Sequence, residues 1–278
     1  MQQLLTLLFG LLTGLSLGAL GSGGSILALP GFVYGAGLAV KPAVATSLLV
    51  VGATSLIGAL MAWRRCAARG CPGQEADPRA AALFAAGGVG GAFAGARAGS
   101  MLPDAAQMAL FTVAVLAAAV GMYRRASRQA AADTVEAPRR PIAPLPLALL
   151  GGGVGLLTGA VGVGGGFLIV PALTLAAGMP VKRAIATSLW VITANAATGS
   201  LGYHGRVPVA WGFGALFLLA SAVGMALGQR LARGARPRGL QRAFALFLVL
   251  VGLASGAQTY HTRQARRAAA RHVTAAPR

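Results

Sequence analysis

Acidic, metal-binding and nucleophilic side chains are scarce in this chain. Its 278 residues include five Asp and Glu, three His and two Cys. The acids all lie in or beside polar intervals between apolar runs, so no carboxylate pair is placed for acid–base work inside a membrane. Two cysteines without a neighbouring histidine are too few for a zinc site. We therefore expect no enzyme, no metal and no cofactor.

Lysine and asparagine are also rare, and their positions are informative. Only two of the 24 basic residues are lysines, Lys41 and Lys182, and the only asparagine is Asn195. Lysine at these two positions of an arginine-rich chain indicates that a compact ammonium is needed there, although a snorkelling membrane anchor explains them equally well. Asn195 lies in an apolar run, so its amide must face another helix or a ligand.

Few residues are charged at all, and most of the charge is positive. Hydrophobic residues make up 56% of the chain, charged residues 10%, and the mean hydropathy is +0.71. These values indicate an integral membrane protein. The net charge of +19 is spread over short loops and the C-terminal region without interleaved aromatics. This pattern favours contact with anionic lipid headgroups and argues against nucleic acid as a partner.

Two stretches of the chain repeat each other. Residues 14–58 and 155–199 align without gaps and share 21 of 45 positions. Both copies contain an apolar run, a glycine-rich break, a short apolar segment ending at proline, and a helix that begins near a lysine. A looser match follows, in which Gly91 and Gly95 correspond to Gly224 and Gly228. The G-x-x-x-G spacing predicts close helix packing there.

The apolar runs predict an all-α fold, a polytopic transmembrane helix bundle of about eight segments. It consists of two related four-segment repeats, residues 1–123 and 145–260, joined by a polar linker at 124–144 and followed by a basic tail at 261–278. The first segment of each repeat is broken by glycines, and the sequence leaves open whether it is kinked or re-entrant. The expected segments are 4–36, 43–62, 80–98, 105–123, 146–177, 184–203, 208–229 and 240–259.

The loop cations predict the orientation of this eight-crossing arrangement. Cytoplasmic termini place more Lys and Arg inside than outside, as the positive-inside rule requires. The loop from Arg230 to Arg242 disagrees, because its five arginines then lie outside.

The glycine-rich breaks are the candidate functional feature. Unpaired backbone groups are costly in lipid, so such breaks survive only inside protein or beside a polar cavity. Each is followed by a new helix, whose N–H groups and dipole favour an anion, and two breaks near the midplane indicate a transporter site. The alternative is a structural or assembly membrane protein whose glycines serve helix packing only. No G-K-[ST] follows the glycines, so nucleotide binding is not expected.

The motif G-x-G-G-[GS]-x-L-x-x-P, followed by V-K-x-A-x-A-T-S-L and present twice, resembles the sulfite exporter TauE/SafE (TSUP) family over about residues 4–260. The resemblance implies a secondary permease of the bacterial inner membrane that moves a small sulfur-containing or organic anion such as sulfite, a sulfonate or thiosulfate. The sequence is compatible with a homo-oligomer.

The candidate substrate-binding residues combine these motif positions with the lysines and the asparagine. The two Thr-Ser pairs either donate hydroxyls to a substrate or bond back to their own helix. The full set is Gly21, Gly23, Gly24, Ser25, Pro30, Lys41, Thr46, Ser47, Gly162, Gly164, Gly165, Gly166, Pro171, Lys182, Thr187, Ser188 and Asn195.

Overall fold

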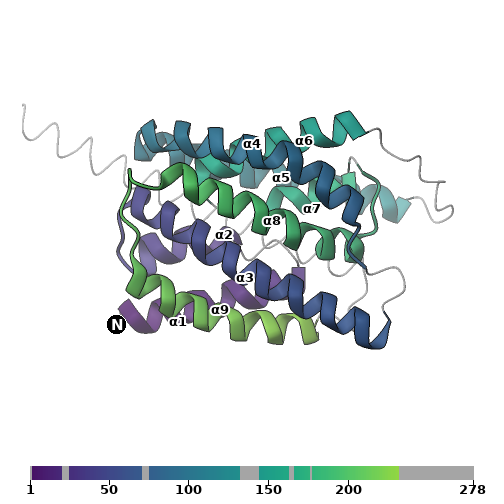
Figure 1. Cartoon of the computed structure of the whole chain (residues 1–278), viewed down its shortest axis with the longest axis horizontal. Coiled ribbons are helices and arrows are strands. Elements are labelled where there is room, and N and C mark those ends of the chain that lie inside the picture. The colour runs from purple at the N-terminus through teal and green to yellow at the C-terminus, as the bar shows by residue number, and fades with distance from the viewer. Residues whose placement is uncertain are drawn as a thin grey trace, which may run out of the picture.

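The computed structural model describes residues 2–20, 25–70, 75–131, 144–162, 166–175 and 177–231. Every regular element in these ranges is a helix (Figure 1), which confirms the all-α prediction. The helices are α1 (Gln2–Leu20), α2 (Ser25–Pro30), its π-helical continuation η1 (Gly31–Gly35), α3 (Val40–Arg69), α4 (Pro78–Met101), α5 (Asp104–Ala131), α6 (Pro144–Val161), α7 (Gly166–Leu175), α8 (Val181–Tyr203) and α9 (Trp211–Leu231).

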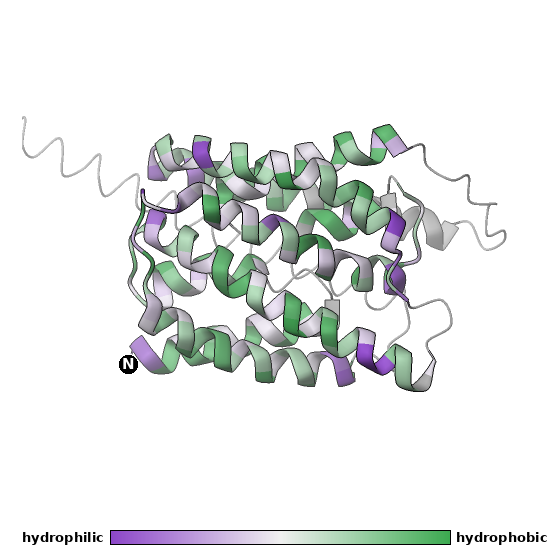
Figure 2. Ribbon diagram, in the orientation of Figure 1, coloured by the Kyte–Doolittle hydropathy of each residue, from purple (hydrophilic) through white to green (hydrophobic). Residues whose placement is uncertain are grey.

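Four of these helices are long and apolar enough to cross a membrane. The spans are Gln2–Ala19 in α1, Val40–Ala68 in α3, Pro144–Val161 in α6 and Trp211–Leu231 in α9. Apolar residues dominate the middle of the bundle and hydrophilic residues gather at helix ends (Figure 2). Large apolar side chains such as Leu4 and Leu219 are exposed, as expected of a surface that contacts lipid. The segment expected at 240–259 lies outside the described residues, so the number eight stays a prediction.

One set of parallel helices consists of α1, α3 and α9. Gly10 of α1 packs against Phe217 of α9, and eight positions further along both helices Gly18 packs against Met225. The α3 helix joins them through hydrogen bonds to the start and the middle of α9. Because α9 belongs to the second sequence repeat, a helix from the other half of the chain completes this set.

The second set consists of α4, α6 and α8 and is built the same way. Gly87 of α4 packs against Ala148 of α6, and Gly99 packs against Ala160. The α8 helix runs parallel to α4, with Gly202 near its end against Ala96. Here α4, from the first repeat, completes a set formed by two helices of the second.

The two sets meet where α3 and α8 cross. Gly52 of α3 faces Ala196 of α8, and Leu48 faces Gly199, so these two helices run antiparallel. Helices at equivalent positions of the two repeats therefore run in opposite directions, as in inverted-repeat transporters.

The paired glycines of α4 and α9 are packing positions, as predicted. A Cβ atom on Gly91, Gly95, Gly224 or Gly228 would lie between 2.0 and 2.2 Å from a backbone carbonyl oxygen of the neighbouring helix. The neighbour is α6 for the first two glycines and α1 for the last two. Only glycine allows backbones to approach this closely.

Each broken segment turns back after its glycines. Gly37 lies against Gln2 at the start of α1, and both Gly31 and Gly35 pack on Phe9. The chain from α2 to η1 therefore runs antiparallel to α1, toward the end where α1 begins. In the second repeat, α6 and α8 are both parallel to α4, so the chain between them, which contains α7, must also return. The question left open by the sequence is thus answered as re-entrant.

This return corrects the loop arrangement used for the orientation. One crossing per broken segment placed the start of the chain on the same side as the 64–79 loop, but α3 begins beside Gln2 and ends at the opposite end of the bundle. The helix α5 also continues to Ala131, inside the stretch predicted as linker, and residues 132–143 lie outside the description.

Candidate functional site

The threonine of each Thr-Ser pair forms a hydrogen bond to a helix start in the other sequence repeat. The Thr46 hydroxyl of α3 accepts a hydrogen bond of 3.0 Å from the N–H of Ala210, directly before α9. The Thr187 hydroxyl of α8 accepts one of 2.9 Å from the N–H of Asp77, directly before α4. Thr187 also donates to the carbonyl of Arg183, at 2.8 Å. Both threonines thus satisfy an N–H group at the start of a helix, which is a structural role that the sequence did not reveal.

The serine of the first pair contacts the second glycine-rich break. The Ser47 hydroxyl donates to the carbonyl of Gly162 and lies 2.9 Å from that of Val44. Gly162 has a φ of +78°, and a Cβ atom there would lie 2.0 Å from Cγ1 of Val44. Only glycine satisfies both requirements. The structure therefore brings together Ser47 and Gly162, two predicted site residues 115 positions apart.

Two residues that the sequence analysis missed bind the end of α6, directly before this break. The Gln107 amide donates to the carbonyl of Ala160 at 2.6 Å and to the Tyr203 hydroxyl at 3.0 Å. The Tyr203 hydroxyl in turn lies 3.3 Å from the carbonyls of Gly159 and Ala160. These contacts satisfy carbonyls that a helix end leaves unpaired. A glutamine within an apolar run was the available signal.

Two exposed tryptophans mark the depth of these contacts. Trp63 near the end of α3 is 62% exposed and Trp211 at the start of α9 is 72% exposed, as expected of side chains at membrane interfaces. Thr46 is level with Ala210, next to Trp211, and the helical rise from Thr46 to Trp63 is about 26 Å. This approaches the hydrocarbon thickness of about 30 Å. The middle of the membrane then lies near Thr54.

The described residues that flank the two breaks lie toward opposite ends of the bundle. Gly162, which precedes the second break, lies at the level of Ser47, near the start of α3. The first break follows α1 directly, and Gly18, close to the end of α1, packs against Met225 toward the end of α9. The described residues that flank the breaks are therefore at different depths, and the site near the midplane formed by both breaks stays a prediction.

Equivalent positions in the middle of the bundle carry different polar groups. In the first set, the hydroxyls of Thr54 and Ser221 are 2.8 Å apart, so that one donates to the other, and each also lies within hydrogen-bond distance of a carbonyl of its own helix. In the second set the equivalent residues are Asn195 and Gly88. Asn195 is 1% exposed, and neither its Oδ1 nor its Nδ2 atom has a partner among the described residues. A Cβ atom on Gly88 would lie 2.5 Å from Oδ1, so the glycine makes room for the amide.

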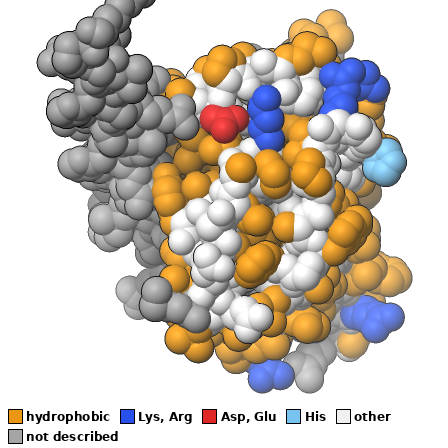
Figure 3. Space-filling view, turned by 90° about the vertical axis from the view of Figure 1, so that its left-hand side faces the viewer, with side chains coloured by type: hydrophobic (Ala, Val, Ile, Leu, Met, Phe, Trp, Pro, Cys, Tyr) orange, Lys and Arg blue, Asp and Glu red, His pale blue; other side chains and the backbone are white. Residues whose placement is uncertain are grey.

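Lys41 and Lys182 lie in the first turns of α3 and α8, and therefore at opposite ends of the bundle. Both are partly exposed, and neither ammonium has a hydrogen bond or ion pair with any described residue. Lys41 belongs to the end shown in Figure 3, where the surface is mainly apolar and uncharged, with scattered cations, an acidic side chain and a histidine.

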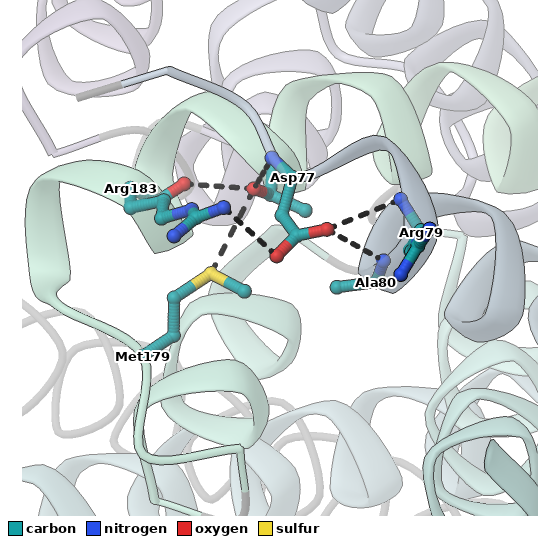
Figure 4. A network of polar contacts seen from close by, with 6 residues as sticks. Asp77, Arg79, Ala80, Met179 and Arg183 are labelled. Atoms are coloured by element: carbon teal, nitrogen blue, oxygen red, sulfur yellow. Dashed lines mark hydrogen bonds and ion pairs between the residues drawn. The ribbon is translucent and has the colours of Figure 1, made fainter. Parts of the chain in front are cut away.

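The end that carries Lys182 also carries an ion pair. Arg183 Nη2 lies 3.1 Å from Asp77 Oδ2, and both side chains are partly exposed. The other carboxylate oxygen of Asp77 accepts hydrogen bonds from the N–H groups of Arg79 and Ala80 and so caps α4 (Figure 4). The equivalent positions in the set of α1, α3 and α9 are Pro42 and Ala210, which cannot form an ion pair.

The remaining candidates are buried or undescribed. Ser25 and Pro30 of α2, Gly166 and Pro171 of α7, and Ser188 of α8 are buried, and Ser188 donates to the carbonyl of Ile185 at 2.9 Å. In the described ranges no three His, Cys, Asp or Glu side chains come together. The candidates outside the described residues are Gly21, Gly23, Gly24, Gly164 and Gly165.

Comparison with known proteins gives a consistent result. A family model described as sulfite exporter TauE/SafE matches residues 6–255. Proteins named "Probable membrane transporter protein" from Xylella fastidiosa strains Temecula1 and 9a5c are each 32% identical, over 88% of this chain and 91% of theirs. "Probable membrane transporter protein YunE" of Bacillus subtilis is 32% identical over 36% of each chain. No solved structure shows a significant match.

Proposed function

Because this chain belongs to the sulfite exporter TauE/SafE family of membrane transporters, we propose that it is a secondary permease for a small sulfur-containing or organic anion of the sulfite, sulfonate or thiosulfate type. The observation that carries the proposal is the pair of lysines without counter-ions. Each occupies the first turn of an equivalent helix, one at each end of the bundle. A cation at both ends attracts an anion from either side.

The substrate path runs between the two breaks. It passes from Lys41 to Ser47 and Gly162, then to the polar middle at Asn195, and on toward Lys182. The glycines and serines of the breaks are the proposed lining, with backbone N–H groups as donors to the anion. Thr46 and Thr187 support this path by fixing the helices around it.

Negative charge does not oppose an anion in the middle of the described bundle. The described acids Glu75, Asp77 and Asp104 all lie at or beyond helix ends. A carboxylate proton relay therefore has no described residues to use, and the membrane potential drives outward movement of an anion at about 2.3 kcal/mol per charge per 100 mV.

The second candidate is a structural or assembly protein, and the close packing at Gly91, Gly95, Gly224 and Gly228 is the observation that favours it. The two candidates differ in one measurable property. A permease is stabilised by its anion in a thermal-shift assay, whereas a packing protein is not.

The experiment compares Lys41→Met, Lys182→Met and the double variant with the wild type in proteoliposome uptake and thermal-shift assays. Sulfite, thiosulfate, sulfate, sulfonates and small carboxylates are the test anions. We expect each lysine variant to lower apparent affinity about tenfold, or 1.4 kcal/mol. Arg97→Met is the matched control, because Arg97 lies over the lipid-facing ring of Phe93, 5.2 Å from its centroid. Wild-type protein that folds but neither binds nor moves any of these anions would support the packing role.

The cation distribution supports a membrane orientation. Among described residues, only Lys41, Arg97 and Arg206 lie at the end where α1, α3 and α9 begin. Positive residues stay in the cytoplasm, so we place the other end there and the start of α1 on the outer face of the bacterial inner membrane. The proposed cytoplasmic end also contains Arg230, the first of the five arginines that disagreed with the eight-crossing orientation. The cations of this second end are Arg64, Arg65, Arg69, Arg79, Arg124, Arg125, Arg128, Lys182, Arg183 and Arg230.

The disulfide at Cys66 argues against this orientation and provides a test of it. It is disulfide-bonded, and the other of the two cysteines is Cys71, outside the described residues. Disulfides persist mainly in oxidising compartments. We give the cations more weight, because they act over several short loops. We expect a membrane-impermeant maleimide to label the cysteines only after cells are permeabilised and reduced. Labelling in intact cells after treatment with an impermeant reductant would contradict this orientation and favour the opposite one.

A further inference from the structure

We infer that Asn195 selects anions that carry an O–H or N–H donor beside their oxyanion group. The inference rests on the proposed permease function and adds the chemistry of its ligand. Its basis is the amide in the middle of the bundle, whose donor and acceptor atoms are both buried and both without a partner among the described residues.

An unpaired buried amide needs an explanation. The great majority of buried polar atoms in proteins have a hydrogen-bond partner, and leaving one unpaired destabilises the protein. Asn195 has two such atoms and is 1% exposed. A ligand that pairs both atoms recovers that cost when it binds, so the unliganded site is prepared for a particular arrangement of donors and acceptors.

The polar side chains at the equivalent place in the other half are paired with each other, although the neighbouring Ser55 hydroxyl is buried without a partner among the described residues. At the equivalent place Thr54 and Ser221 satisfy each other at 2.8 Å. The same chain thus contains a closed polar pair and an open one. The difference is created by Gly88, which stands where the other half has a serine and has no side chain to offer the amide.

The amide determines which ligands fit. An asparagine offers two N–H donors at Nδ2 and one acceptor at Oδ1. A fully deprotonated oxyanion can accept from Nδ2, but it also presents negative oxygens to Oδ1, which stays unpaired. An anion with an additional O–H or N–H donates to Oδ1 and satisfies both atoms. Protonated oxyanions such as hydrogen sulfite, and hydroxy- or amino-substituted sulfonates and carboxylates, have this combination.

Recognition of the anion by Asn195 also indicates how a proton crosses the membrane. The described acids lie at helix ends, so none holds a proton beside Asn195. For an acidic oxyanion that titrates near neutral pH, the species recognised is the protonated one, and the proton crosses on the substrate itself.

The test uses pairs of anions of equal charge and similar shape that differ only in the donor. These pairs are 2-hydroxyethanesulfonate against propane-1-sulfonate, and glycolate against propionate, measured by thermal shift and by competition in proteoliposome uptake. We expect wild-type protein to prefer the hydroxylated member about tenfold, which corresponds to 1.4 kcal/mol.

The central variant is Asn195→Thr combined with Gly88→Ser, which copies the closed pair of Thr54 and Ser221. It is designed to fold, because the three heavy atoms nearest to a Cβ atom on Gly88 all belong to the Asn195 amide, which the variant also replaces. We expect it to lose the preference, whereas the control Thr54→Val keeps it. Asn195→Leu, of similar volume, gives a second measurement of the same loss.

The outcomes separate this inference from the function on which it rests. Equal binding of both members of each pair by the wild type would overturn the selection by Asn195 and leave the permease intact, with a bound water as the partner of the amide. A preference that survives in the double variant would overturn it too. Folded wild-type protein that binds no anion would refute the permease and this inference together.

Discussion

The two halves of this molecule share their packing and differ in their polar groups. The α1–α9 and α4–α6 pairs have the same glycine contacts, and Thr46 and Thr187 make equivalent hydrogen bonds to the start of α9 and α4. The middle carries a closed Thr54–Ser221 pair in one half and an open Asn195 in the other. Helix contacts therefore persisted after duplication, whereas the groups that could contact a ligand diverged.

The largest effect is expected from disrupting the glycine contacts between helices that the two halves share. Gly14→Ala and Gly95→Ala would each place a Cβ atom within 2.0 Å of a carbonyl oxygen, that of Ser221 or Leu156. Because backbone cannot move aside as a side chain can, we expect a loss of about 3 kcal/mol or more in either half. The measurement is the melting temperature and the monodisperse yield in detergent.

The matched controls for these variants are neighbouring glycines. Gly90→Ala and Gly153→Ala meet nothing within 4 Å. We expect them to be neutral or to stabilise their helices by up to about 1 kcal/mol. Equal damage from both kinds of variant would contradict the packing described for the glycines.

The next effect comes from the shared threonines. Thr46→Val and Thr187→Val leave the N–H groups of Ala210 and Asp77 without their acceptor, so we expect each to lower stability by about 1–3 kcal/mol. Similar losses in both variants would support the equivalence of the halves. Thr112→Val is the control, because its hydroxyl bonds only within its own helix, to the carbonyl of Met108 at 3.0 Å. If Thr112→Val lowers stability as much as Thr46→Val and Thr187→Val do, the hydrogen bonds between repeats are not the cause of the loss.

Exchanging the polar residues in the middle of the two halves tests directly how the halves differ. The Asn195→Thr and Gly88→Ser double variant replaces an unpaired amide with a paired hydroxyl, so we expect it to be more stable than wild type by about 1–2 kcal/mol. The reverse exchange, Thr54→Asn with Ser221→Gly, should destabilise by a similar amount. Chemical or thermal unfolding in detergent measures both, and a less stable first double variant would contradict an unpaired Asn195.

The smallest effect is expected at the end of the bundle that carries Asp77 and Arg183. Asp77→Ala removes the cap of α4 and the ion pair with Arg183, and we expect a loss of about 1 kcal/mol. Asp77→Asn retains a capping side chain and should lose less. Because the ion pair is partly exposed, its share should vanish at high salt. A melting-temperature difference between wild type and Asp77→Asn that is independent of salt would argue against a contribution from the ion pair.

The sequence revealed the fold class and the packing glycines, because a direct repeat and a G-x-x-x-G spacing survive in the residues themselves. It could not show that the chain returns after each break, since glycine permits either direction. That return places the 64–79 loop at the opposite end of the bundle from the start of the chain, and the orientation proposed above follows from this arrangement. Hydrogen bonds between repeats were also hidden, which is why Thr46 and Thr187 were interpreted as local or ligand-binding hydroxyls.

Among the polar residues of the site, the sequence identified Asn195 but not its surroundings. A single asparagine in an apolar run is conspicuous, whereas Gly88 is one of 41 glycines and gains meaning only from the helix opposite. Gln107 and Tyr203 were missed for a related reason. Their roles depend on where α6 ends, and helix ends beside a break cannot be located from apolar periodicity.

The exchange of helices between the repeats has a consequence for biosynthesis. The packing partner of α1 is α9, which begins roughly 190 residues later and, at a synthesis rate of about 5–20 residues per second, emerges roughly 10–40 s afterwards. During that interval the small-residue face of α1 has only lipid beside it. A ribosome that stalls before α9 leaves α1 without the helix that packs against its glycines, so residues 1–123 do not contain every helix that their own packing uses.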